Sequence, residues 1–509
     1  MVTQLRPYQH RAVDAVRGKL KDGARRIALI APTGAGKTIM FSDMIARAVA
    51  NGRRALVLVH RRELVDQAVA KLRALDLKVG IILGGVKPSP DCPVQVASIQ
   101  TLGAMQNGRR CRELPPADLV VVDEAHHAVS PSWRRIIEAY PSAVILGATA
   151  TPWRTDKRGL SDMFDTHVLA ATVSELIENG SLSQYEAYAY DAPDLHTVPV
   201  VAGEFHQGRL SLACNTAVLV GGIVKEYLSY GRGKRALLFA ASIAHSLALV
   251  EELRGNGVRA EHLDGETPPG ERADVLRQLA AGDVHVVSNV GVFTEGFDSP
   301  GVEVVILARP TMSLSLHLQM CGRGLRPAPG KERALLVDHG GNFLRHGLPD
   351  DERDYALTAT PVRSKELGQC PLCRQIYGRL RDDGSCPKCK QIIAPPRAVR
   401  EEQERQEKKR LEGERIEAER IRELRKQHAS SVPTEVKRKY YERLLAEAKN
   451  KRYKAGWAFV RFKLAFGHAP NFGGTRTAKP APAQQQQLGV GCTCLIGEAL
   501  CGWCAGRAR

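Results

Sequence analysis

The sequence predicts an α/β protein with two parallel-sheet domains in tandem, followed by a zinc ribbon and a helical basic C-terminal extension. Over residues 1–362, apolar runs of strand length alternate with segments of helix length, which is typical of parallel sheets. The chain has 509 residues, enough for several domains of about 100–200 residues each. Two Cys-x₂-Cys pairs and most of the basic excess follow the second α/β segment.

Composition narrows the class of protein. Hydrophobic residues make up 43% of the chain, enough for sizeable cores, so wholesale disorder is excluded. No apolar run approaches the roughly 18–20 residues that a membrane helix needs, and the N-terminal residues lack the pattern of a secretory signal. We therefore expect a cytoplasmic protein with reduced cysteines and no membrane partner.

The positive charge is concentrated near the C-terminus. The net charge is +18 for the whole chain, but only +2 for residues 1–362. Residues 363–400 carry +6 and residues 431–480 carry +9. A clustered basic excess is the electrostatic footprint of a partner with a phosphate backbone. General solubility is the alternative explanation, and the placement favours nucleic acid.

A phosphate-binding loop follows the first apolar run. Residues 27–38 read IALIAPTGAGKT, which nearly matches G-x-x-x-x-G-K-[ST], with Ala31 at the first glycine position. The glycines let backbone N–H groups wrap phosphates, the lysine reaches the β- and γ-phosphates, and the threonine hydroxyl holds Mg²⁺. The predicted nucleotide-binding residues are Gly34, Gly36, Lys37 and Thr38.

A second strand-like run ends in acidic residues. Residues 119–127 read LVVVDEAHH, and ligands bind at the carboxyl ends of parallel strands. Asp123 is suited to hold Mg²⁺, and Glu124 to orient or deprotonate an attacking water. His126 is suited to couple the site to its surroundings. Together with the phosphate loop, this pair predicts a site for ATP hydrolysis.

With these motifs the sequence resembles the superfamily 2 helicases of DEAH-box type, whose motor consists of two RecA-like domains with ATP between them. LRPYQ at 5–9 resembles the adenine-side element of that family, which implies that Arg6 and Gln9 bind the nucleotide. Further segments resemble, in chain order, motif Ia, motif Ib, motif III, motif IV, the turn before motif V, and motif V. In the same order they lie at 56–68, 98–101, 147–152, 236–242, 262–267 and 286–302.

The resemblance extends to the second half of the motor. Within the motif V segment, Glu295, Gly296 and Asp298 match the family pattern, which implies that the last two bind the nucleotide. QMCGRGLRP at 319–327 fits Q-x-x-G-R-x-x-R. This match implies catalytic roles for Gln319, Arg323 and Arg326, the arginines reaching the γ-phosphate as arginine fingers do.

The chain is expected to divide into six segments. Residues 180–215, at the start of the second domain, are expected to be irregular. The expected segments are a RecA-like ATP-binding domain at 1–165, a RecA-like C-terminal helicase domain at 166–362, a zinc ribbon at 363–397, a charged helical spacer at 398–432, a basic helical nucleic-acid-binding module at 433–475, and a linker with a Cys-rich tail at 476–509.

Two cysteine quartets are candidates for zinc. The first has the spacing of a zinc ribbon, and its four thiolates predict a closed, structural Zn²⁺ site. Basic residues around it are predicted to touch phosphates or to form a solvated face. The second quartet is less standard, and a flexible tail is the alternative. The predicted ligands are Cys370, Cys373, Cys386 and Cys389; the second quartet is Cys492, Cys494, Cys501 and Cys504; the basic residues are Arg374, Arg379, Arg381, Lys388 and Lys390.

The C-terminal extension combines charge with aromatic residues. Residues 398–428 are nearly all charged and predict a solvated helix, with a coiled coil as the lesser alternative. In residues 433–470, basic residues precede GWAFVRFKLAFGHAP. The aromatic residues are expected to build a small helical core and the basic ones to contact nucleic acid. Stacking of Trp457 or Phe459 on bases is the alternative.

The whole layout resembles the RadD-like DNA repair helicases of bacteria and phages, which are related to restriction-enzyme motor subunits. The resemblance implies an ATP-dependent DNA helicase or translocase in repair, recombination or replication. It implies single-stranded or forked DNA, and repair or replication proteins, as partners. No P-D…(D/E)-x-K nuclease constellation is recognisable. The alternative of an RNA helicase stays open because such motors contact mainly the backbone of the nucleic acid, which carries little information about its identity. An ATP-switched scaffold is disfavoured because it needs no water-activating Glu124.

Overall fold

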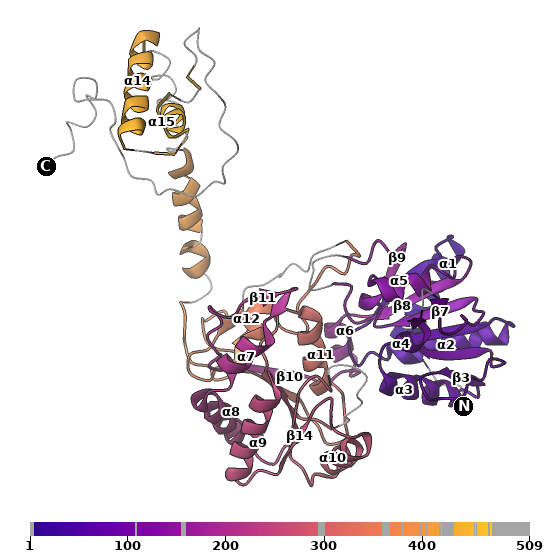
Figure 1. Cartoon of the computed structure of the whole chain (residues 1–509). Helices are drawn as coiled ribbons and strands as arrows, with labels where there is room; N and C mark the ends of the chain where they lie inside the picture. The colour runs from indigo at the N-terminus through magenta and orange to yellow at the C-terminus, as the bar shows by residue number, and fades with distance from the viewer. Residues whose placement is uncertain are drawn as a thin grey trace. The chain divides into compact units, whose positions relative to one another are not determined.

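The computed structural model describes most of the chain, in two compact units, Met1–Pro396 and Arg397–Arg509. The first unit contains two large sheets and the cysteine ribbon (Figure 1). In the described part, no helix is both long and apolar enough to span a membrane. The described residues are 5–106, 109–153, 159–293, 301–358, 367–377, 381–395, 399–403, 405–412, 414–416, 419, 432–451, 453–454, 456–466 and 469–470.

The first sheet has seven parallel strands in the order β3-β4-β2-β7-β8-β1-β9. Its central strands are mostly apolar because helices cover both faces. The strands are β1 (Arg26–Ile30), β2 (Ala55–Val59), β3 (Val79–Ile82), β4 (Val94–Ser98), β7 (Leu119–Asp123), β8 (Val144–Thr149) and β9 (Thr166–Leu169). One face is covered by α1 (Pro7–Lys21), α2 (Lys37–Ala50) and α3 (Arg62–Arg73), the other by α4 (Ile99–Leu102) and α5 (Pro131–Ile137).

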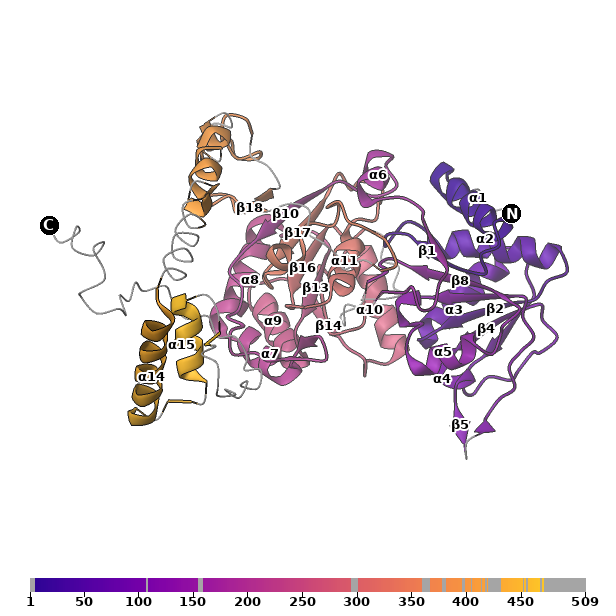
Figure 2. The same cartoon turned by 90° about the horizontal axis from the view of Figure 1, so that it is seen from above.

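The second sheet has six parallel strands in the order β10-β17-β16-β13-β15-β14. Helices α8 and α9 pack on one face, and α10 and α11 on the other (Figure 2). The strands are β10 (Tyr185–Ala189), β13 (Ala236–Ala240), β14 (Ala260–Leu263), β15 (Val286–Asn289), β16 (Val304–Ala308) and β17 (Ala334–Asp338). The helices are α8 (Ala217–Tyr230), α9 (Ile243–Gly255), α10 (Pro269–Ala281) and α11 (Leu314–Gly324).

These sheets confirm the predicted fold class of two parallel-sheet, RecA-like domains in tandem. Strand β9 pairs with β1, with Leu29 opposite Val168, so the first sheet continues past residue 165. The smaller elements of the unit are β5 (Met105–Gln106), β6 (Arg109–Arg110), η1 (Ala125–His127), α6 (Val173–Glu178), β11 (Val200–Val201), β12 (Glu204–Phe205), α7 (Gln207–Cys214), α12 (Asn342–His346), β18 (Gly368–Gln369) and β19 (Ile376–Tyr377).

The expectation of an irregular stretch at 180–215 was wrong. This stretch contains the edge strand β10, the hairpin β11–β12 and helix α7. The hairpin carries Glu204, whose carboxylate accepts hydrogen bonds from the Thr311 hydroxyl at 2.5 Å and from the Met312 N–H at 2.8 Å. Ser313, the next residue, caps α11 by accepting from the Leu316 N–H. The hairpin therefore fixes the turn from which α11 starts.

The second unit contains the hairpin of α14 (Thr434–Asn450) and α15 (Trp457–Phe466). Phe462 and Phe466 lie in its core, which confirms the predicted aromatic core, whereas Val460 and Leu464 are exposed. The described residues between 399 and 419 are helical. Arg410 there pairs with two acidic residues of the same helix, as expected for a solvated helix.

Two glycines of the first unit give a matched test of this packing. A side-chain methyl at Gly147, in β8, would overlap the ring of Phe164 and lie 2.8 Å from the Ala125 Cβ. We expect Gly147→Ala to lower the free energy of unfolding by about 1–3 kcal/mol. Gly222, in α8, has nothing within 4 Å of such a methyl, so Gly222→Ala should leave stability unchanged or raise it by up to about 1 kcal/mol. Urea unfolding followed by circular dichroism measures both, and equal effects would contradict the packing described.

Candidate active site and metal centre

The predicted phosphate loop connects β1 to α2 at the carboxyl edge of the first sheet. Gly34 and Gly36 have φ values of +90° and +78°, a left-handed conformation that favours glycine. Gly36 caps α2, and Lys37 is its first residue, with Nζ 3.3 Å from the Ala31 carbonyl oxygen. The turn places the N-terminus of this 14-residue helix at the loop. The positive end of the helix dipole therefore faces the loop, which favours the binding of phosphate.

Helix α1 holds this loop from the side. The Gln9 side-chain amide donates to the Ala35 carbonyl at 3.0 Å, and its oxygen accepts from the Arg6 N–H at 2.9 Å. The Tyr8 hydroxyl donates to the same Ala35 carbonyl at 2.9 Å. Of the two residues predicted on the adenine side, Gln9 therefore lies against the phosphate loop, while Arg6 is exposed and contacts Gln9 through its backbone N–H. Sequence reasoning did not identify Tyr8, whose contact spans 27 positions of the chain.

The acidic pair lies where β7 ends. Asp123 is the last residue of the strand, and Glu124 follows in a left-handed conformation with φ of 52°. Loss of hydration and the neighbouring Glu124 carboxylate raise the pKa of Asp123 to about 6, while the positive charge of Lys37 opposes the shift. A desolvated carboxylate beside a second one is stabilised by a cation, and oxygen ligands are what Mg²⁺ prefers. The donor set therefore fits the implied Mg²⁺.

A chain of polar contacts leads from the acidic pair to α11. His126 Nδ1 lies 3.4 Å from Glu124 Oε2 and 3.4 Å from Thr149 Oγ1. Thr149 donates to the Thr151 carbonyl at 2.8 Å, and the Thr151 hydroxyl donates to the Ser315 hydroxyl at 2.8 Å. The segment resembling motif III thus links His126 to the helix that carries the predicted arginines. Ser315 was not predicted from the sequence.

Helix α11 packs on the phosphate loop. Gln319 and Arg323 are buried within it, 4% and 3% exposed, and Arg326 follows its end. A methyl at Gly322 would lie only 2.6 Å from the Thr33 Cβ, and one at Gly34 would lie 3.9 Å from the Arg326 Cγ. The predicted motif VI residues are therefore next to the phosphate loop. Of the motif V residues, Glu295, Gly296 and Asp298 lie outside the described residues.

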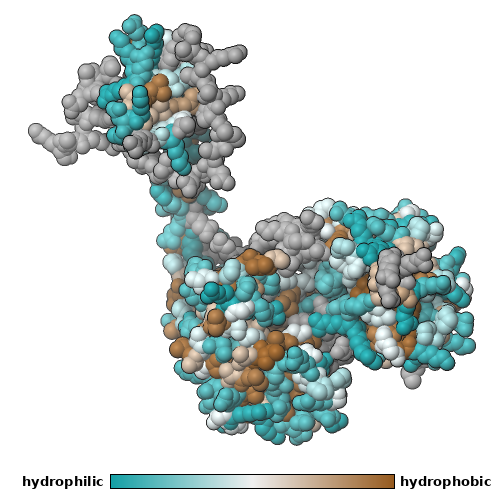
Figure 3. All heavy atoms as spheres, viewed as in Figure 1, coloured by the Kyte–Doolittle hydropathy of each residue, from teal (hydrophilic) through white to brown (hydrophobic). Residues whose placement is uncertain are grey.

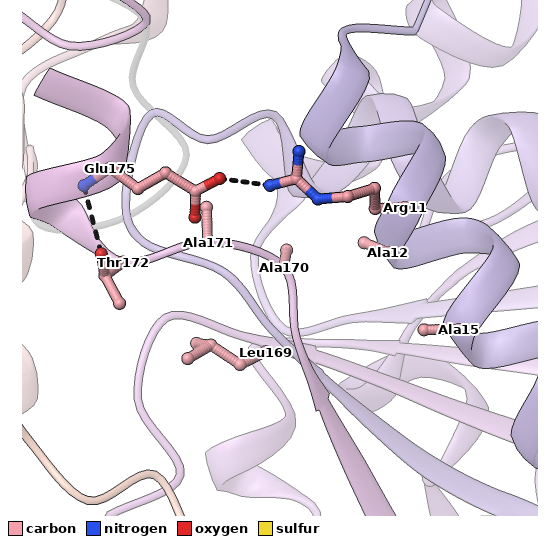
Figure 4. A pocket seen from close by; sticks show the side chains of 8 residues that line it. All are labelled: Arg11, Ala12, Ala15, Leu169, Ala170, Ala171, Thr172 and Glu175. Carbon is pink, nitrogen blue, oxygen red and sulfur yellow. Dashed lines mark hydrogen bonds and ion pairs between the residues drawn. The ribbon is translucent and has the colours of Figure 1, made fainter. Parts of the chain in front are cut away.

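A pocket opens beside α1, where β9 runs into α6 (Figure 4). An ion pair between Arg11 and Glu175 spans it, and Thr172 caps α6 by accepting from the Glu175 N–H at 3.1 Å. The pocket contains none of the predicted site residues, although α1 also carries Gln9. Its lining is small and mostly apolar, consisting of Arg11, Ala12, Ala15, Leu169, Ala170, Ala171, Thr172 and Glu175.

The first cysteine quartet converges. The Sγ atoms of Cys370, Cys373, Cys386 and Cys389 all lie within 4.8 Å of one another. The Cys370–Cys389 and Cys373–Cys386 sulfur pairs are 3.7 Å and 3.6 Å apart. Four thiolates about 2.3 Å from a tetrahedral zinc would be about 3.8 Å apart, so the four cysteines could hold Zn²⁺ with no position open to substrate. The second quartet, from Cys492 to Cys504, lies outside the described residues.

The two halves of the quartet have the same turn. Arg374 and Lys390, which directly follow Cys373 and Cys389, have φ values of 60° and 61°. The Arg374 N–H donates to the Cys370 carbonyl at 3.0 Å, and the Lys390 N–H donates to the Cys386 carbonyl at 3.1 Å. This repetition is what a site built from two similar Cys-x₂-Cys turns requires.

The cysteine ribbon docks on the edge strand β10. The Ala189 N–H donates to the Arg374 carbonyl at 3.2 Å, and Tyr188 bridges to Gln375. The Lys388 ammonium pairs with Glu186 and lies 4.6 Å from the centre of the Tyr188 ring. Lys388, one of the residues expected to touch phosphate, is therefore engaged within the protein, and the ribbon contacts the edge of the second sheet through an isolated β-bridge.

Comparisons with known proteins agree with the geometry. The family model for the type III restriction enzyme res subunit matches residues 3–154, and the helicase conserved C-terminal domain matches residues 221–328. The chain is 31% identical over 353 residues to the 51.5 kDa protein of Lactococcus phage (isolate 7-9), covering 68% of this chain and 74% of that one. It is 34% identical over 364 residues to the "Putative ATP-dependent helicase IRC3" of Saccharomyces cerevisiae, covering 66% of this chain and 51% of that one.

A solved structure shares the fold. The ATP-dependent Type ISP restriction-modification enzyme LlaBIII bound to DNA aligns with a TM-score of 0.53 at 18% identity, over 66% of this chain and 28% of that one. A type I restriction enzyme subunit of Escherichia coli, the EcoAI endonuclease subunit, is 24% identical over 355 residues, which is 63% of this chain and 44% of that one. The chain belongs to the superfamily 2 helicases that are related to the motor subunits of restriction enzymes.

The cysteine centre gives a direct prediction. Cys386→Ser should lower the bound zinc from one ion per chain towards none, because three thiolates bind more weakly than four. The same change should destabilise the protein, because the ribbon docks on β10. Plasma emission spectrometry and thermal unfolding measure the two effects. Cys111→Ser, at an exposed cysteine outside the quartet, is the control and should change neither. A wild-type protein without zinc would contradict the assignment.

Proposed function

We propose that this chain is an ATP-dependent DNA helicase or translocase that couples ATP hydrolysis to movement on, or unwinding of, DNA. The observation that carries the proposal is the meeting of three elements at one edge of the first sheet. The phosphate loop contributes Lys37, strand β7 contributes Asp123, and α11 from the second sheet packs on the loop beside Thr33. Elements of both sheets therefore contribute to one nucleotide site, as a motor driven by relative domain movement requires.

The proposal gives each residue a role. The helix N-terminus at Gly36 and the Lys37 ammonium would bind the phosphates, and Thr38 and Asp123 would hold Mg²⁺. The bound Mg²⁺ supplies charge neutralisation on the phosphates. Glu124 orients the attacking water, and Arg323 and Arg326 stabilise the charge that develops during transfer.

The polar chain from Glu124 suggests how hydrolysis reaches the second sheet. It passes through His126 and Thr149 to Thr151, and from there to Ser315 on α11. When the hydrogen-bond partners of Glu124 change during hydrolysis, His126 shifts, and the hydroxyl contacts transmit this shift to α11. Because α11 also carries Arg323, the same helix both contributes to the ATP site and moves when the contents of that site change.

DNA is the proposed partner on three grounds. The basic excess of the C-terminal segments predicts a polyphosphate partner. The relatives include restriction enzymes, and the LlaBIII structure is bound to DNA. The sequence layout resembles RadD-like repair helicases, which supports a role in DNA repair, recombination or replication in the cytoplasm. The proposal includes Zn²⁺ as the structural ion of the ribbon.

A substitution in the acidic pair tests the proposed chemistry. Glu124→Gln should leave ATP affinity within about threefold of wild type but lower the maximal rate of hydrolysis by about 100-fold or more, because the amide cannot accept the proton of the water. Fluorescent-nucleotide binding and phosphate release measure the two quantities.

Lys37→Ala is the companion variant for that measurement. It should abolish turnover and weaken nucleotide binding as well, because Lys37 contacts the phosphates in both the ground and transition states. Near-normal turnover in Lys37→Ala, or loss of ATP binding in Glu124→Gln, would contradict the assignments.

A further inference from the structure

Three side chains form a stack where α14 connects to α15. The ring centres of Tyr453 and Trp457 are 4.5 Å apart, with 32° between the ring planes. The Arg461 guanidinium carbon lies 5.5 Å from the centre of the Trp457 ring. Trp457 and Arg461 are one helical turn apart on α15, and Tyr453 lies in the connecting segment. The stack therefore runs along one side of the hairpin.

This stack lies at the edge of the hairpin core, against which Trp457 packs. The core is made by Phe462, Phe466 and their neighbours on α14, and Phe462 is 0% exposed. Tyr453, by contrast, is 43% exposed. Its backbone N–H donates to the Ala448 carbonyl at 3.0 Å, and the Trp457 N–H donates to the Lys454 carbonyl at 3.1 Å. Backbone bonds thus hold Tyr453 at the end of α14 and Trp457 next to Lys454, and the Tyr453 ring is presented to solvent.

The surroundings of the stack are basic. Lys449, Lys451 and Lys454 are exposed at the end of α14 and just after it. Lys451 forms an ion pair with Glu447 at 2.8 Å. Figure 3 shows α14 as a mostly hydrophilic surface. Exposed ammonium groups beside an exposed aromatic ring combine attraction for phosphate with a face on which a planar group can stack.

We propose that Tyr453, Trp457 and Arg461 form a base-stacking site for single-stranded DNA, with the neighbouring lysines contacting its phosphates. Single strands are bound by basic grooves in which successive bases stack on aromatic rings and guanidinium groups. Bases in a duplex are already stacked on each other and do not expose a face to a protein ring. The inference rests on the proposed function for its choice of DNA as the strand. It assigns a contact with unpaired DNA to the second unit of the chain.

The test compares strands with and without bases. Full-length protein is titrated without ATP into a fluorescein-labelled thymidine oligonucleotide and into an abasic strand of the same length. Tyr453→Leu should bind the thymidine strand about 10-fold more weakly and the abasic strand as wild type does. Tyr453→Phe keeps the ring and should restore wild-type binding. Leu464→Ala changes a side chain on α15 that is 74% exposed. It is the matched control and should change the binding of neither strand.

Two further variants separate stacking from charge and from folding. Lys454→Ala should weaken the binding of both strands by the same factor, because it removes only a phosphate contact. If Tyr453→Leu lowers the helical signal in circular dichroism, Arg461→Gln replaces it, since that change leaves both rings in place. Arg461→Gln should weaken binding of the thymidine strand more than binding of the abasic strand. Equal binding of the thymidine strand by wild type and Tyr453→Leu, or equal losses on both strands, would overturn the stacking site.

An ATP hydrolysis assay distinguishes failure of the stacking site from failure of the proposed function. The same proteins are assayed for ATP hydrolysis at increasing concentrations of the thymidine strand. A wild type that hydrolyses ATP only with DNA, and a Tyr453→Leu variant that needs more DNA for the same maximal rate, support both proposals. A wild type that DNA does not stimulate counts against the proposed function. A stimulated wild type with an indistinguishable Tyr453→Leu variant counts against the stack alone.

Discussion

The structure of the motor depends on one electrostatic constraint, the pair of adjacent carboxylates at the end of β7. Asp123 and Glu124 lie side by side at a sheet edge, where loss of hydration raises the pKa of Asp123 to about 6. Such a pair is costly unless positive charge is brought to it. The phosphate loop provides that charge through Lys37, and its glycine turns point a helix N-terminus at the same place. Mg²⁺ with a nucleotide would complete the neutralisation.

Parallel topology explains how these groups come together. In the first sheet β7 is separated from β1 only by β8, so the acidic pair and the phosphate loop leave the same edge close to each other. Strand β8 between them ends at Thr149, which together with Thr151 just beyond it supplies the hydroxyls of the polar chain that ends at Ser315. On the other side, Glu204 fixes the start of α11. The arginine-bearing helix is thus positioned by contacts at its first turn and by the phosphate loop against its middle.

Sequence alone predicted the parts of the site that are contiguous in the chain. The phosphate loop and the acidic pair each follow a short apolar strand, so their residues could be identified from pattern and spacing. The contacts that join separate segments could not. Tyr8 reaches Ala35, Glu204 reaches Thr311, and Lys388 reaches Glu186, each across many intervening residues. Strand β10 was missed because this edge strand, YEAYA, consists of Tyr, Glu and Ala and lacks the run of Val, Ile and Leu that is typical of a central strand.

The central claim is that nucleic acid controls the ATP site, and steady-state ATP hydrolysis tests it most directly. Purified protein would be assayed alone and with single-stranded DNA, forked DNA, duplex DNA or RNA, at one fixed low salt concentration. We predict slow turnover alone and strong stimulation by a DNA form containing a single strand. Turnover that is unchanged by every nucleic acid, or that only RNA stimulates, would contradict the account.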